Sequence, residues 1–144
     1  MTIFTQSVRI FFGMHRQSSI EKFFSQDDRR QSSQIVHFQK IEKMPYADFQ
    51  RKILSKVLQY GRLRSKIVRI LGRSFFKELP EYEILQAANQ LVVKAKGIHD
   101  EKRLAEFMVQ AQCRRESLDF VQWRIYYFED YSPNESVFVF KCAH

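Results

Sequence analysis

The sequence has little of what marks secreted, fibrous or membrane-spanning proteins. Its 144 residues include only two cysteines, Cys113 and Cys142, which are too few for the disulfide framework of a small secreted domain. Four glycines, three prolines and 44% hydrophobic residues exclude a collagenous, low-complexity or disordered chain. No apolar run approaches the ~20 residues that cross a bilayer. We therefore expect an intracellular protein with one packed core and reduced thiols.

Metal-binding and cofactor-binding motifs are also missing. Neither cysteine belongs to a CxxC pair, and Cys142 with His144 offers two ligands where a zinc site needs about four. The sequence contains no phosphate-binding glycine loop, no GxSxG nucleophile elbow, no helix-turn-helix or zinc-finger spacing and no ribonucleoprotein-type aromatic motif. We therefore expect no metal and no tightly bound cofactor, and we regard nucleic acid as an unlikely partner.

Positive charge is what the sequence has in excess, and it is concentrated in one segment. The formal net charge is +8 and the pI is about 9.7. Between positions 51 and 77 the chain has nine basic residues and no acid, whereas the rest has 15 basic and 16 acidic residues. The nine are Arg51, Lys52, Lys56, Arg62, Arg64, Lys66, Arg69, Arg73 and Lys77. This pattern predicts a patch for an anionic partner such as a membrane surface, or else a solvated face that pairs with acids elsewhere.

The hydrophobic pattern predicts a mixed α/β chain with two parts. Residues 1–34 form a polar and basic N-terminal segment, read as a loop from 17 to 34 with a short helical turn at 20–24. Residues 35–144 carry the periodic segments. These predict a strand at 35–41, a helix after Pro45, a strand or extended arm at 63–71, a loop at 79–81, a strand around 91–93, a helix capped by Asp100, and a final β-hairpin of 123–129 and 137–142.

Four segments, in order, carry a resemblance to one family. They are Tyr60-Gly61-Arg62-Leu63-Arg64-Ser65-Lys66-Ile67-Val68, Phe75-Phe76-Lys77-Glu78, Ser117-Leu118-Asp119 followed by Trp123, and the apolar run Val137–His144. The stretch from about Ile35 to His144 resembles the N-terminal part of the wax ester synthase/diacylglycerol acyltransferase family, which is related to chloramphenicol acetyltransferase. The resemblance implies a mixed sheet with flanking helices that forms part of a CoA-dependent acyltransferase domain.

The resemblance also implies a catalytic residue. In that family the second histidine of an HHxxxDG motif is the general base that deprotonates an acceptor alcohol, which then attacks the thioester of acyl-CoA. An imidazole suits this role because its pKa lies near neutral pH. Aligned on Lys141, the first histidine is replaced by Ala143 and the second falls on His144, where the given sequence ends. The motif's aspartate and glycine are not present, so we expect no acyl transfer by this chain alone.

Two functions therefore remain open. The first is an N-terminal part of an O-acyltransferase that transfers a fatty acyl group from acyl-CoA to a long-chain alcohol or diacylglycerol, peripheral to the endoplasmic reticulum membrane or lipid droplets. The alternative is a non-catalytic module whose 51–77 segment binds an anionic membrane or a nucleic acid. His15, His37 and His99 match no motif of the family and are read as structural or surface residues.

Overall fold

The centre of the protein is a four-stranded mixed β-sheet. The structure is a computed structural model that describes residues 34–114 and 120–143. The strand order is β1-β6-β5-β4; β6 is antiparallel to both of its neighbours, and β4 is parallel to β5. The strands are β1 (Gln34–Glu42), β4 (Val92–Ala95), β5 (Trp123–Phe128) and β6 (Glu135–Ala143).

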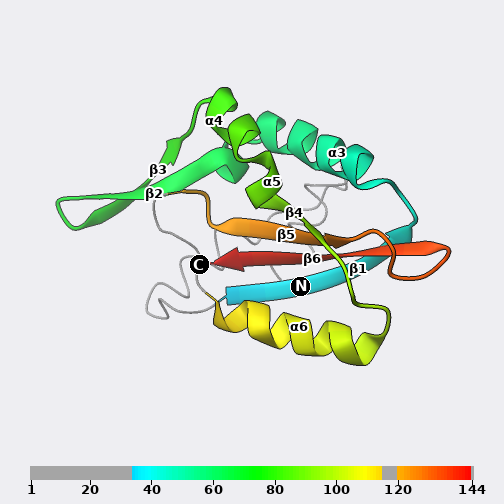
Figure 1. The fold of residues 1–144 in the computed structure, drawn as a ribbon. Coiled ribbons are helices and arrows are strands. Elements are labelled where there is room, and N and C mark those ends of the chain that lie inside the picture. Colours follow the sequence, from blue (N-terminus) through cyan, green and yellow to red (C-terminus); the bar gives the residue numbers. More distant parts are fainter. Residues whose placement is uncertain (1–33, 115–119, 144) are drawn as a thin grey trace, which may run out of the picture.

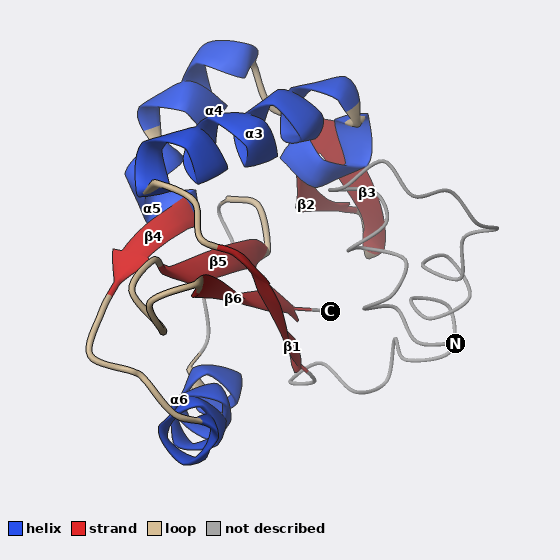
Figure 2. Cartoon of the chain, turned by 90° about the vertical axis from the view of Figure 1, so that its right-hand side faces the viewer, coloured by secondary structure: helices blue, strands red, loops and turns tan. Residues whose placement is uncertain are grey.

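Helices cover both faces of this sheet. Figures 1 and 2 show α3, α4 and α5 on one face and α6 on the other. Their bounds are α3 Tyr46–Gln59, α4 Glu81–Gln86, α5 Ala88–Leu91 and α6 Glu101–Cys113. None of the helices in the described ranges has the length and apolar character needed to cross a bilayer. The result is a three-layer arrangement of helix, sheet and helix.

β6 is buried on both faces because it lies inside the sheet between two helical layers. Phe138 and Phe140 pack with α3 in one hydrophobic cluster, while Val137 and Val139 pack with α6 in another. Neighbouring residues of a strand point to opposite faces, so a strand between two layers needs apolar residues at every position. The unbroken apolar run from 137 to 140 meets this requirement.

The two long helices begin where the sequence predicts. Pro45 precedes the first turn of α3, where its missing N–H costs nothing. Phe49, Ile53 and Val57 then recur on one face and are fully buried. Asp100 caps α6, because its carboxylate accepts a hydrogen bond of 2.8 Å from the backbone N–H of Arg103.

A two-stranded ribbon projects from this body. A short 3₁₀ turn, η1 (Gly61–Arg64), follows α3 and leads into β2 (Ser65–Ile70) and β3 (Arg73–Glu78). These two strands pair only with each other in the described part of the chain, and Figure 1 shows them extending away from the sheet. We call residues 65–78 the arm.

Most of the predicted elements are confirmed. The strand at 35–41, the helix after Pro45, the Asp100-capped helix and the final antiparallel hairpin are all present, and so is the mixed α/β class. Of the segment 63–71, for which a strand or an extended arm was predicted, residues 65–70 form β2 of the projecting arm, whereas Leu63 and Arg64 belong to η1 and Leu71 lies in the turn. The predicted loop at 79–81 is shorter than expected because α4 starts at Glu81, and Leu91 ends α5 instead of starting β4. The predictions for residues 1–33 lie outside the described residues.

Candidate functional site

The family resemblance predicts a catalytic histidine, His144, directly after the end of β6. At this end β6 is held between two strands, with Gln34 of β1 paired with Ala143 and Trp123 of β5 paired with Cys142. The described chain reaches Ala143, so His144 itself lies outside the described residues. Up to this point β6 is an inner strand with a partner strand on each side.

Trp123 connects this strand end to the base of the arm. Its indole Nε1 donates a hydrogen bond of 2.6 Å to the carbonyl oxygen of Leu63 in η1, and its side chain is buried. A buried indole N–H needs a partner, and here the partner is the segment that starts the arm. The end of β6 and the root of the arm are thus part of one packed unit.

Lys141 is a buried charged residue near the C-terminal end of the inner strand β6. Its side chain is 1% exposed, and its Nζ donates a hydrogen bond to the carbonyl oxygen of Arg114, at the C-terminus of α6. The carbonyl groups at a helix C-terminus attract a cation because the helix dipole is negative there. Sequence reasoning used Lys141 only to align the motif. A lone lysine in a run of doubly buried apolar residues was the signal that could have singled it out.

Cys142 is an unsuitable nucleophile. It packs beside the cluster on the α3 face, and burial raises the pKa of its thiol to about 12. The thiol therefore stays protonated at neutral pH, and only the thiolate is nucleophilic or binds a metal. In the described ranges no three His, Cys, Asp or Glu side chains form a group that could hold a metal ion.

The structure divides the nine predicted cations between two places. Arg51, Lys52 and Lys56 lie on α3, whereas the other six lie on η1 or the arm. Two of the nine form ion pairs in the described ranges: Arg51 with Asp48 at 3.2 Å, and Arg64 with Glu78 at 2.9 Å. The six cations of the arm and its root are Arg62, Arg64, Lys66, Arg69, Arg73 and Lys77.

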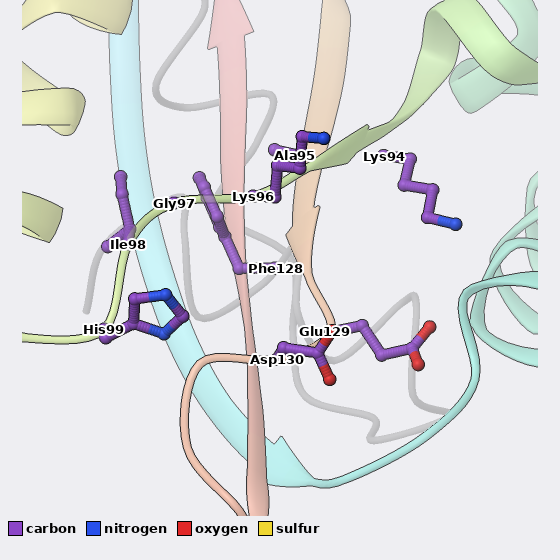
Figure 3. Close-up of a pocket in the computed structure, with 9 residues that line it drawn as sticks. All are labelled: Lys94, Ala95, Lys96, Gly97, Ile98, His99, Phe128, Glu129 and Asp130. Atoms are coloured by element: carbon purple, nitrogen blue, oxygen red, sulfur yellow. The ribbon is translucent and has the colours of Figure 1, made fainter.

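A separate cavity of about 470 Å³ lies at the carboxyl ends of β4 and β5 (Figure 3). Three of its polar side chains, Glu129, Asp130 and His99, contact other parts of the fold. Glu129 accepts a hydrogen bond of 2.7 Å from the backbone N–H of Tyr46 at the start of α3. Lys43 lies 2.8 Å from Asp130 and holds the pKa of that carboxyl below its usual range. His99 has its Nδ1 3.4 Å from the carbonyl oxygen of Tyr131. The cavity was not predicted from the sequence, and its lining includes no nucleophile paired with a base.

Comparison with known proteins gives a fold and no family. No family model and no curated protein sequence matches the chain. Among solved structures, one similar chain comes from the work described as "Molecular basis for condensation domain-mediated chain release from the enacyloxin polyketide synthase". The TM-score is 0.54 at 15% identity, and the match covers 79% of this chain but only 22% of that one. The chain thus has a mixed α/β fold like part of a condensation domain, the fold type shared with chloramphenicol acetyltransferase.

Proposed function

We propose that this chain is the N-terminal part of an acyl-CoA-dependent O-acyltransferase in which His144 is the general base. The observation that carries the proposal is the position of β6. It is the doubly buried inner strand of an acyltransferase-like fold, and it ends immediately before His144. A catalytic base has to be held within about half an ångström of its working position, and a strand or helix provides such precision better than a loop does.

The proposed reaction follows from the chemistry of an imidazole. His144 takes the hydroxyl proton of the acceptor, and the oxygen attacks the thioester carbonyl of acyl-CoA. The carbon–sulfur bond then breaks, and the imidazolium returns the proton to the departing CoA thiolate. The proposed acceptors are a long-chain alcohol or a diacylglycerol, and acyl-CoA is a co-substrate rather than a bound cofactor. Such acceptors reside in membranes, so the proposed location is the surface of the endoplasmic reticulum or of lipid droplets.

The first test is the transcript across the codon for His144. The proposal expects an open frame that continues with three residues, an aspartate and a glycine, followed by the rest of an acyltransferase domain. A stop codon directly after His144 in the natural transcript, together with inactivity of the chain, would overturn it.

The second test is acyl transfer by the protein made from that transcript. With labelled acyl-CoA and either hexadecanol or diacylglycerol, we expect His144→Ala to lower kcat at least 100-fold, the lower range of general base catalysis. His99→Ala is the matched control, because His99 lies beside the cavity at the carboxyl ends of β4 and β5, and β6 ends at the opposite end of the sheet. Equal turnover by the His144→Ala and His99→Ala proteins would refute the assignment of the base.

A further inference from the structure

The arm exposes large apolar side chains that the body does not cover. All six residues of β3 are exposed, including Phe75 and Phe76. At the turn, Ile70 is exposed and Leu71 is 98% exposed. A soluble surface seldom groups so many large apolar residues, and where it does the patch usually binds something.

The strand register sorts the arm's residues into two faces, because residues directly opposite in a ladder share a face. One face carries the pairs Lys66–Lys77, Val68–Phe75 and Ile70–Arg73. We call this the cationic face. It alternates three positive charges with apolar side chains, and none of its residues is acidic.

The cationic face contains an unfavourable pair. Lys66 and Lys77 lie directly opposite each other, an arrangement that destabilises a ladder through repulsion of like charges. Within the described ranges no carboxylate lies at ion-pair distance from Lys66, Arg73 or Lys77. An anion between these side chains would remove the repulsion.

On the opposite face of the arm, Glu78 and Phe76 contact basic side chains of η1. Its pairs are Ser65–Glu78, Ile67–Phe76 and Arg69–Ser74. Glu78 forms the ion pair with Arg64, and the Arg62 guanidinium lies 4.4 Å from the centre of the Phe76 ring. The single acid of the arm is thus neutralised on the face away from the three cations.

The turn between β2 and β3 holds a leucine in a strained backbone conformation. Leu71 has φ 51° and Gly72 has φ 79°. A two-residue type I′ hairpin turn requires a positive φ at both of these positions. Glycine and asparagine adopt positive φ readily, whereas a leucine there costs free energy. Because Leu71 is almost fully exposed, the fold gains nothing from its side chain. Its presence at the tip needs a reason outside the folded chain.

We propose that the arm binds an anionic lipid membrane through its cationic face and its tip. Lys66, Arg73 and Lys77 contact the lipid phosphates, while Leu71 and Ile70 enter the acyl boundary. Charge complementarity accounts for the cations, and the two adjacent apolar side chains of the tip, Ile70 and Leu71, favour a membrane because both would be buried at its acyl boundary. This inference is independent of the catalytic proposal, because it uses no residue at the end of β6.

The experiment is flotation of the 144-residue chain with vesicles of neutral phosphatidylcholine, with and without one-third phosphatidylserine. We expect binding to the anionic vesicles, weaker binding to the neutral ones, and a decline in binding as salt increases. Each cation near the surface contributes about fivefold, so K66Q/R73Q/K77Q should bind on the order of 100-fold more weakly.

Two variants separate the contributions of tip and charge. Leu71→Asn should weaken binding about tenfold without changing its salt dependence, because it removes apolar contact and no charge. It should also melt at the same temperature as the parent or higher, since asparagine tolerates the left-handed region. The matched charge control is K102Q/R103Q/R114Q, which removes three exposed cations from α6 and its C-terminal end and should retain arm-dependent binding.

Three outcomes would overturn the inference. One is an absence of binding to anionic vesicles by a chain that melts cooperatively. Another is equal weakening by the arm and α6 triple variants, which would indicate a response to net charge alone. The third is tighter binding to a duplex DNA oligonucleotide than to the anionic vesicles, which would make a nucleic acid the partner of the arm.

Discussion

Phe49 is the residue on which the α3 face of the core most depends. Its side chain is fully buried. The ring stacks on Tyr127 of β5, with ring centres 4.0 Å apart and planes 8° apart, and it lies 5.5 Å from the Phe138 ring of β6. One aromatic side chain of α3 thus contacts both inner strands of the sheet.

Replacing Phe49 by alanine should destabilise the fold strongly. Truncation of a buried phenylalanine costs about 3–5 kcal/mol through lost transfer free energy and the cavity left behind. The stacking of Phe49 on Tyr127 contributes ~0.5–1.5 kcal/mol, and the range for truncation already includes part of this contribution. We expect a loss of about 4 kcal/mol, a large share of the ~5–15 kcal/mol that stabilises an ordinary domain.

Urea unfolding followed by tryptophan fluorescence measures this loss. The chain has a single tryptophan, Trp123, which is buried in the same hydrophobic cluster as Phe49. Its fluorescence therefore reports on the unfolding of this cluster. The matched control is Phe38→Ala on β1, where the ring is partly exposed and the loss should be about 1 kcal/mol or less. If Phe49→Ala does not fold, Phe49→Leu should lose about 1.5 kcal/mol. A loss for Phe49→Ala no larger than that for Phe38→Ala would refute the assignment of the core.

Three smaller predictions test other parts of the structure. Asp100→Ala should lower the free energy of unfolding by about 1 kcal/mol through loss of the α6 cap, whereas Asp100→Ser should lose little; equal losses in urea unfolding would contradict the cap. A thiol reagent at pH 8 should label the exposed Cys113 at once and Cys142 only on unfolding, because burial raises the pKa of Cys142 to about 12; rapid labelling of both thiols in the folded chain would contradict this. Burial also raises the pKa of the Tyr127 phenol, so the unfolded chain gives up this proton at a lower pH than the folded one. The free energy of unfolding should therefore fall as the pH rises past the ordinary tyrosine pKa of about 10, and an equally steep fall for Tyr127→Phe would argue against it.

The body of the fold was predictable because its signals are local and strong. α3 follows a proline and repeats buried residues such as Phe49, Ile53 and Val57 at helical spacing. The β5–β6 hairpin has two apolar runs around a polar turn. In each case the residues that decide the structure are neighbours in the sequence, so the pattern can be read without knowing the rest of the chain.

The missed elements are those whose signals are short or come from distant residues. α4 has six residues and α5 has four, lengths at which helical periodicity cannot be distinguished from chance. The segment Phe75-Phe76-Lys77-Glu78 was used only as part of the family resemblance, and no strand was predicted there. The strand β3 leaves no burial pattern in the sequence because all six of its residues are exposed and no residue of the arm belongs to either hydrophobic cluster.

The burial of Lys141 and the pairing of Lys66 with Lys77 could not be predicted either, because both depend on contacts between residues that are distant in the sequence. Buried Lys141 donates a hydrogen bond to the carbonyl oxygen of Arg114 at the C-terminus of α6, 27 positions away in the sequence, and the sequence alone cannot bring these two residues together. The opposition of Lys66 and Lys77 depends on the register of the arm, which a two-residue turn at Leu71 and Gly72 sets. Sequence reasoning counted both lysines as members of a patch but had no means to place them face to face.

The strand β6 and the arm differ in how firmly the rest of the fold holds them. β6 is paired with a strand on each side and is buried on both faces as far as Lys141, which is the support that a base acting at a fixed position requires. The arm pairs only with itself and is anchored at its root by the contact of Trp123 with Leu63, which is enough to present a surface but not to align a reacting atom. Substitutions at His144 should therefore change turnover without changing vesicle binding, and Leu71→Asn should change vesicle binding without changing kcat on a soluble acceptor. A Leu71→Asn protein with impaired turnover on a soluble acceptor would show that the arm also shapes the reaction site, and the two proposals would then have to be merged into one.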